Sequence, residues 1–238
     1  MTRAPGRTVP ARRGYEMWAR GYDAENAVTT LERIAANHLT PSLTGARLLD
    51  AACGIGRRLP DVSPEGPARA IGLDLVLEML RTGVLHGATA SPVLNADITA
   101  LPLAPASFDL VWCRLALGHV DDVESAYREF HRVLATPGFL IVTDFHPDAA
   151  RAGHRRTFHD PSGGPRAVAF HSHSIDTHVE CARLAGLELD DRRDLRIGLE
   201  VRPFYEAAGK LARYEADVGL PLVFGLRFRA PLSRSRSR

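Results

Sequence analysis

Apolar positions in this chain form short continuous runs that alternate with helical repeats. The runs occupy residues 46–53, 69–74, 91–97, 108–117 and 138–145. Between them, residues 75–87 and 123–134 carry apolar side chains at i, i+3 and i+4 spacing, which indicates amphipathic helices. Continuous apolar strands are typical of a parallel sheet that is buried on both faces. The pattern predicts an α/β fold, a Rossmann-like three-layer α/β/α sandwich around a mostly parallel seven-stranded sheet.

The two ends of the chain depart from this alternation. Helical spacing runs from about Tyr15 to Leu39 with a break at 21–23, and the segment after the first apolar run is expected to be helical to about Val62. After Pro147 we expect a hairpin around 162–165, a helix over 175–185, a strand over 187–198, a helix over 200–216 and a final antiparallel edge strand over 221–231.

These elements suggest one domain over residues 12–232. Its first part, 12–40, is predicted to be a helical lid, and 148–175 an insertion after the fifth strand. Residues 1–11 show no periodicity and are predicted to be unstructured. Residues 233–238 form a basic tail, SRSRSR.

Composition narrows the class of protein. The chain has 238 residues, 45% apolar and 24% charged, a formal net charge of +2 and only three cysteines. No stretch approaches the roughly 18 apolar residues of a membrane span, and no cysteine pair has the spacing of a metal site. We therefore expect a cytoplasmic monomer or homodimer that acts on a small molecule, with no membrane or nucleic-acid partner.

Acidic and small residues stand at the ends of three successive strands. The first strand runs into Asp50-Ala51-Ala52-Cys53-Gly54-Ile55-Gly56, the second ends at Asp74, and the third at Asp97-Ile98. Small residues at the first strand–helix junction let a ligand approach free backbone N–H groups. A carboxylate at the end of the second strand can accept both hydroxyls of a ribose. In an open parallel sheet these strand ends line one crevice.

With these motifs the chain resembles the class I S-adenosylmethionine-dependent methyltransferases, in the branch of the ubiquinone/menaquinone-type enzymes. The segments LLDAACGIG, IGLD, NADITALPLAPASFDLV and EFHRVLATPGFLIVTDF carry the resemblance, over roughly residues 15–147. It implies S-adenosylmethionine as cofactor and a methyl transfer as the reaction. By the resemblance, the cofactor would be held by Asp50, Ala52, Gly54, Gly56, Asp74, Leu75, Asp97, Ile98, Arg114 and Tyr22.

One position departs from the family pattern. The family prefers glycine where this chain has Ala52, and the added methyl group is expected to loosen binding rather than abolish it. A dehydrogenase is disfavoured, because its GxGxxG motif would place Leu59 where a small residue is required. The segment after the fourth strand, Cys113-Arg114-Leu115-Ala116, lacks the NPPY-type motif of enzymes that methylate nucleic-acid bases.

Histidines are the candidate catalytic bases, because methylation of many acceptors requires loss of a proton. His119 and His146 follow the fourth and fifth strands, where the family keeps substrate residues. His171 and His173 alternate, so on a strand they would share one face. We predict that they line a polar pocket wall and that no metal is bound.

Aromatic residues complete the predicted substrate pocket. Tyr15 and Trp18 form a stripe with Tyr22 at helical spacing, and Phe204 and Tyr205 are expected on the opposite wall. Arg155, Arg156 and Arg202 could bind an acidic group of the substrate or lie on the surface. The predicted function is methylation of a small, cyclic or aromatic molecule. The alternatives are a non-catalytic S-adenosylmethionine-binding protein and a nucleic-acid methyltransferase recruited by the basic tail.

Overall fold

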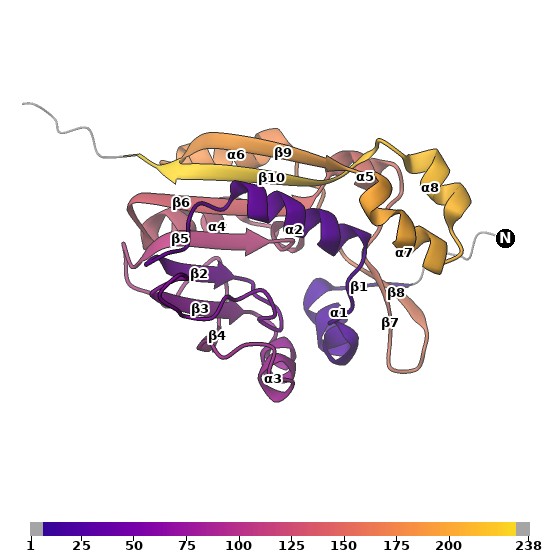
Figure 1. The fold of residues 1–238 in the computed structure, drawn as a ribbon, viewed down its shortest axis with the longest axis horizontal. Helices are drawn as coiled ribbons and strands as arrows, with labels where there is room; N and C mark the ends of the chain where they lie inside the picture. The colour runs from indigo at the N-terminus through magenta and orange to yellow at the C-terminus, as the bar shows by residue number, and fades with distance from the viewer. Residues whose placement is uncertain (1–6, 232–238) are drawn as a thin grey trace, which may run out of the picture.

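The computed structural model describes residues 7–231 and is built around one seven-stranded sheet (Figure 1). The strand order is β4-β3-β2-β5-β6-β10-β9. The strands are β2 (Arg47–Ala51), β3 (Arg69–Asp74), β4 (Val93–Asn95), β5 (Phe108–Arg114), β6 (Leu134–Phe145), β9 (Glu188–Arg196) and β10 (Pro221–Ala230).

The pairing of these strands confirms the predicted fold class. From β4 to β6 every neighbouring pair is parallel, whereas β10 is antiparallel to both β6 and β9. The antiparallel pairing lies at this edge of the sheet, as expected. The final strand itself is second from the edge, and β9 is outermost.

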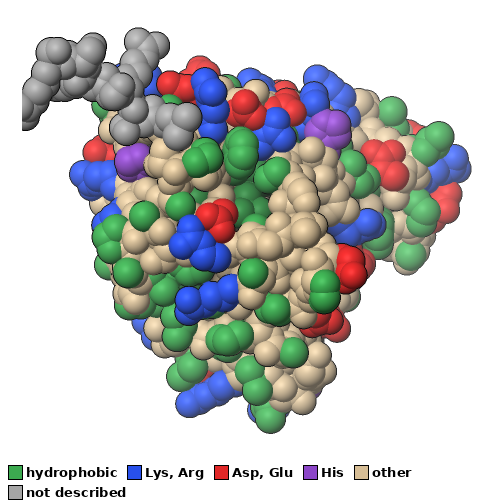
Figure 2. All heavy atoms as spheres, turned by 60° about the vertical axis from the view of Figure 1, so that its left-hand side comes forward, with side chains coloured by type: hydrophobic (Ala, Val, Ile, Leu, Met, Phe, Trp, Pro, Cys, Tyr) green, Lys and Arg blue, Asp and Glu red, His purple; other side chains and the backbone are tan. Residues whose placement is uncertain are grey.

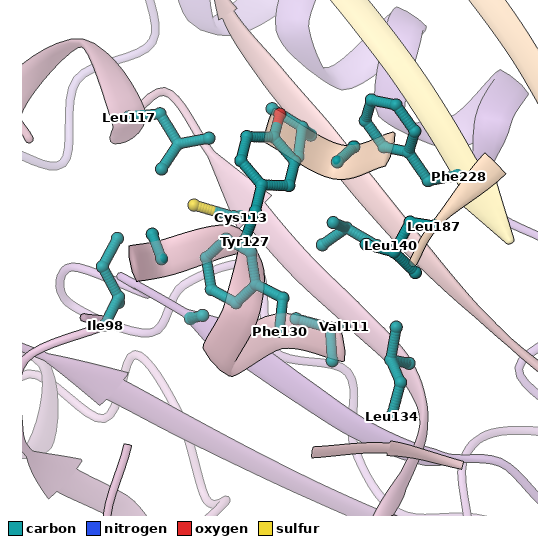
Figure 3. Packing of buried hydrophobic residues seen from close by; sticks show 14 of the residues in the cluster. Ile98, Val111, Cys113, Leu117, Tyr127, Phe130, Leu134, Leu140, Leu187 and Phe228 are labelled. Carbon is teal, nitrogen blue, oxygen red and sulfur yellow. The ribbon is translucent and has the colours of Figure 1, made fainter. Parts of the chain in front are cut away.

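Helices cover both faces of the sheet because successive strand residues point to opposite sides. On one face, α4 (Val123–Val133) and α6 (Ile175–Leu184) pack over a core that includes Tyr127, Val111 and Leu140. Figure 3 shows Tyr127 and Phe130 of α4 packed in one cluster with the strand residues Val111 and Leu140. On the other face, α2 (Ala27–Leu39) crosses β6, β10 and β9 (Figure 1).

A second, smaller sheet ties the start of the chain to the insertion after β6. Its strands are β1 (Arg7–Val9), β8 (Pro165–Val168) and β7 (Thr157–His159), in the order β1-β8-β7. The prediction of an unstructured segment over 1–11 is therefore wrong for residues 7–9, because β8 supplies a parallel partner. The helix α1 (Ala11–Trp18) and a 3-10 turn, η1 (Ala19–Gly21), follow β1. Stacking of Trp18 on Phe158 fixes α1 against the hairpin.

The remaining elements are α3 (Leu77–Leu85), η2 (Leu117–His119), α5 (Pro147–Arg151), η3 (Leu199–Val201), α7 (Arg202–Ala207) and α8 (Leu211–Asp217). Two helix predictions need correction. Residues 52–68 form turns and an irregular loop, since Pro60, Pro64 and Pro67 lack the N–H groups that a helix needs. The helix expected over 200–216 is divided near Gly209, whose φ is +64°.

The surface carries mixed charge. On the face shown in Figure 2, basic and acidic side chains lie interspersed, without a broad area of one sign among the described residues drawn there. Within residues 7–231, the helices are all too short or too polar to cross a membrane. The basic tail predicted at 233–238 lies outside the described residues.

Candidate active site

The glycine loop leaves the carboxyl end of β2 in an unusual backbone conformation. Ala52 has a φ of +68° and Gly54 a φ of +61°, both in the left-handed region. Glycine adopts this region freely, whereas a side chain with a Cβ is strained there. This conformation explains why glycine suits position 52, and it shows that Ala52 holds the loop at a cost in backbone strain.

Both carboxylate oxygens of Asp74, at the end of β3, accept hydrogen bonds from backbone N–H groups. The N–H of Gly54 donates to its Oδ2 at 2.8 Å, and the N–H of Val76 donates to its Oδ1 at 2.8 Å. Burial raises the pKa of Asp74 to about 6, although both N–H groups favour the ionised form. The carboxylate thus links the glycine loop to the start of the next helix.

A cavity of about 300 Å³ opens between the glycine loop and α1, and we call it the glycine-loop cavity. Eight of the ten predicted cofactor residues line it, namely Tyr22, Ala52, Gly54, Asp74, Leu75, Asp97, Ile98 and Arg114. Gly56 does not line it. Residues without a sequence signal complete the wall, among them Val76, Met79 and Ala116.

Asp50 lies in an adjoining recess, which we call the Asp50 recess. This small space, about 50 Å³, is bordered also by Glu32, Arg57, Arg58 and Arg114. Asp50 is almost fully buried, and its Oδ2 pairs with the guanidinium of Arg114 at 2.9 Å. Its Oδ1 is buried and has no hydrogen-bond partner among residues 7–231. An unpartnered buried carboxylate oxygen is costly and marks a place where a ligand donor would fit.

His119 is held by two hydrogen bonds. Its Nδ1 lies 3.0 Å from the carbonyl oxygen of Ala169, so this nitrogen carries the proton and donates it. Its Nε2 must then accept the hydroxyl of Tyr15, 2.9 Å away. Burial lowers the pKa of His119 to about 4, and the positive charge of Arg156 acts in the same direction. His119 is therefore neutral at physiological pH, with both ring nitrogens engaged.

A second cavity of about 320 Å³, which we call the β8 cavity, adjoins the glycine-loop cavity at Leu115. Leu115 has a φ of +53° and lines both. Arg156 enters the β8 cavity and donates to the carbonyl oxygen of Leu115 at 2.9 Å and to the hydroxyl of Tyr22 at 3.3 Å. The sequence offered Arg156 only as one of three candidate arginines, because nothing in it reveals contacts across 134 residues.

The other predicted residues do not meet at these cavities. His146 is buried against Phe224, and its Nε2 lies 4.0 Å from Asp194. His171 and His173 stack on each other, and the Nε2–H of His173 donates to the carbonyl oxygen of Val120 at 2.8 Å. Phe204 and Tyr205 join an apolar cluster with Tyr214 and others. Of the predicted substrate residues, Tyr15 alone lines the glycine-loop cavity.

The sequence of this chain is similar to those of known methyltransferases. A family model described as a methyltransferase domain matches residues 49–142. The chain is 36% identical over 157 residues to a malonyl-[acyl-carrier protein] O-methyltransferase from Gallionella capsiferriformans (strain ES-2), covering 59% of this chain and 52% of that protein. It is 33% identical over 135 residues to a demethylmenaquinone methyltransferase from Roseiflexus castenholzii (strain DSM 13941 / HLO8), covering 53% of this chain and 56% of that protein. The chain thus spans about half the length of these relatives.

A solved structure supports the fold. The crystal structure of an S-adenosylmethionine-dependent methyltransferase from Mesorhizobium loti matches with a TM-score of 0.62 and 23% identity, covering 84% of this chain and 97% of that one. The strand order, the glycine loop and the sequence relatives agree. The chain belongs to the class I S-adenosylmethionine-dependent methyltransferase family.

Proposed function

We propose that this chain transfers the methyl group of S-adenosylmethionine to a small organic molecule. One observation carries the proposal: the glycine loop, Asp74 and the Asp97-Ile98 pair come from three strand ends and surround a single cavity. The relatives named above act on a malonyl group attached to a carrier protein and on demethylmenaquinone. Because their acceptors differ, the acceptor of this chain has to be argued from its own cavities.

The Asp50 recess suits the amino-acid end of the cofactor. The free Oδ1 of Asp50 would accept an N–H of the ammonium group, which supplies the donor that the folded chain lacks. Arg57, Arg58 and Arg114 border the same recess and would balance the cofactor carboxylate. Charges of both signs in one small space fit a zwitterion better than they fit a simple anion or cation.

The glycine-loop cavity suits the nucleoside. Asp74 would accept the ribose hydroxyls when it is ionised, and Leu75, Val76 and Ile98 would pack against the adenine ring. The N–H and the hydroxyl of Thr99 both donate to Oδ1 of Asp97, each at 2.8 Å. The Oδ2 of Asp97 accepts no hydrogen bond from residues 7–231, so it would be available to the exocyclic amine.

When bound, S-adenosylmethionine supplies an electrophilic methyl group on a positively charged sulfur atom. The chain's own contribution is to orient the acceptor and to exclude water. Tyr15 and Tyr22 place aromatic rings on the cavity wall, where they would favour a nearby cation. His119, with both nitrogens engaged, would act as a positioning residue that holds α1 over the cavity through Tyr15.

Turnover with labelled cofactor tests this function. Purified protein is incubated with S-adenosylmethionine labelled in its methyl group. Each reaction also contains one candidate acceptor from a panel of carboxylic acids, phenols and amines. We expect the label to appear in the methylated acceptor as S-adenosylhomocysteine forms, at a rate at least tenfold lower for Asp50→Asn. Asp109→Asn is the matched control, because Asp109 pairs with Arg47 and lines none of these cavities. Cofactor binding without turnover on any panel would favour the non-catalytic alternative.

A further inference from the structure

The β8 cavity holds an arginine that has no ion-pair partner among residues 7–231. Among residues 7–231, no carboxylate lies within ion-pair distance of the Arg156 guanidinium, which is partly buried. A guanidinium has five N–H groups, and the two hydrogen bonds that Arg156 donates go to a neutral carbonyl and a neutral hydroxyl. Its other N–H groups have no acceptor within the described part of the chain. A buried cation of this kind is costly unless an anion joins it.

The other charged groups facing this cavity leave the balance positive. The two oxygens of Asp144 already accept the N–H groups of Gly118 and Phe145, at 2.6 and 2.7 Å. Burial raises the pKa of Asp144, while the positive charge of Arg156 acts in the opposite direction. Arg155 donates only to main-chain carbonyls.

Arg151 and His154, which also face the cavity, each have a carboxylate partner outside its wall. Arg151 pairs with Asp148, and His154 pairs with Asp217. Arg155 and Arg156 are then the cationic side chains of the wall without a carboxylate partner among residues 7–231, and Arg156 is the less exposed of the two.

The rest of the wall of the β8 cavity is mostly apolar, with Thr8 and Ser172 as the polar exceptions. Val28, Phe145, Val168 and Phe170 come from α2, β6, β8 and the segment after it. An apolar wall with one convergent cation is the arrangement expected for a molecule with a hydrocarbon body and one anionic group.

Among residues 7–231, the titratable groups on the border between the two cavities are already hydrogen-bonded. His119 has both nitrogens engaged, and the oxygens of Asp144 are bonded to the backbone. An acceptor that must lose a proton before it reacts would need a free base. A carboxylate needs none, because it is already ionised at neutral pH.

From these observations, and resting on the function proposed above, we propose that the methyl acceptor is a carboxylic acid with an apolar body, bound in the β8 cavity with its carboxylate on Arg156. The carboxylate oxygen supplies the electron pair of the new O–CH₃ bond. The S–CH₃ bond of S-adenosylmethionine breaks, and the sulfonium becomes the thioether of S-adenosylhomocysteine. The product is a methyl ester, and no proton is released.

Binding to matched acids and amides tests the assignment. Calorimetry is carried out with hexanoate, octanoate and decanoate and with the corresponding primary amides, in the presence of saturating S-adenosylhomocysteine. At least one acid should bind tenfold or more tightly than its amide, and Arg156→Gln should remove that preference. Equal binding of acids and amides, or no binding of any acid at millimolar concentration, overturns the proposal. S-Adenosylhomocysteine binding, measured first and alone, reports separately on the proposed function.

Two control variants separate the charge from the structure around it. Tyr22→Phe removes one partner of Arg156 but keeps the guanidinium, and it should keep the preference for the acid. Arg183→Gln removes an exposed arginine that pairs with Glu180 on α6 and should change nothing. Turnover of the preferred acid should be level between pH 6 and pH 8. A rate that rises about tenfold per pH unit there would indicate that a proton has to be removed, and would contradict a carboxylate acceptor.

Discussion

At the residue scale, the positive φ angles of the glycine loop connect backbone energetics with ligand binding. Ala52 and Gly54 adopt the same left-handed conformation, but only Ala52 has a side chain that opposes it. Strain of this kind persists where the surrounding structure holds it, and it is common at binding sites. The pair therefore offers two substitutions with opposite expected effects.

Ala52→Gly is expected to stabilise the protein. Relief of the left-handed strain is worth roughly 1–2 kcal/mol, and the greater freedom of glycine in the unfolded chain takes back roughly 0.5–1 kcal/mol. A net gain of about 0.5–1 kcal/mol in the free energy of unfolding should appear in urea denaturation. Gly54→Ala should move the same quantity in the opposite direction, since its Cβ would also meet Met79 at 3.3 Å. A destabilised Ala52→Gly variant would contradict the backbone assignment.

Asp74 should make cofactor binding depend on pH. Its pKa is about 6, so below that pH it takes up a proton and accepts the ribose hydroxyls less well. The dissociation constant of S-adenosylhomocysteine should rise about tenfold per unit of pH below 6. Asp74→Asn should bind weakly at every pH and lose this slope. Wild-type binding that is level from pH 7 down to pH 5 would show that the ionised carboxylate is not required.

The same pKa shift affects stability with a definite sign. The folded chain releases the Asp74 proton near pH 6, whereas the unfolded chain releases it near pH 3.8. Between these values the folded chain binds more protons, so the contribution of Asp74 to stability falls as the pH rises from about 4 to about 6. The burial of the Asp74 carboxylate thus lowers the free energy of unfolding at neutral pH.

At the element scale, close packing holds the glycine loop against α3. A Cβ added at Gly83 would lie 2.0 Å from the carbonyl oxygen of Ile55, which is part of the backbone and cannot yield easily. Gly83→Ala should therefore lower the free energy of unfolding by about 2–3 kcal/mol and weaken S-adenosylhomocysteine binding. Gly21→Ala is the control, because a Cβ there meets nothing within 4 Å. A Gly83→Ala variant as stable as that control would refute this packing.

Side-chain contacts, among them the hydrogen bond between Tyr15 and His119, hold the helix α1 over the glycine-loop cavity. Tyr15→Phe removes the hydroxyl group that donates a hydrogen bond to His119. The loss should lower the free energy of local unfolding of α1 by about 1 kcal/mol. Amide hydrogen exchange over residues 11–18 should then become roughly fivefold faster, while α4 keeps its protection. Glu16→Gln, which affects only ion pairs with Arg12 and Arg13, should leave the exchange unchanged. Equal exchange in wild type and Tyr15→Phe would contradict the role given to His119.

At the scale of the whole molecule, most features that follow from the parallel sheet could be predicted from the sequence. Asp74 and Asp97 could be placed in one crevice because parallel strands bring their carboxyl ends together. Contacts made outside the sheet were not predictable in this way. The pairing of β1 with β8, the bond from His119 to Ala169 and the bond from Arg156 to Tyr22 join distant segments whose local patterns carry no sign of a partner.

Titration calorimetry with S-adenosylhomocysteine at pH 7.5 tests whether the glycine-loop cavity and the Asp50 recess bind the cofactor. We predict one site per chain with a micromolar dissociation constant, a rise in the melting temperature at saturating ligand, and at least tenfold weaker binding by Asp50→Asn. Failure of the wild-type chain to bind S-adenosylhomocysteine or S-adenosylmethionine would contradict the account, as would undiminished binding by Asp50→Asn.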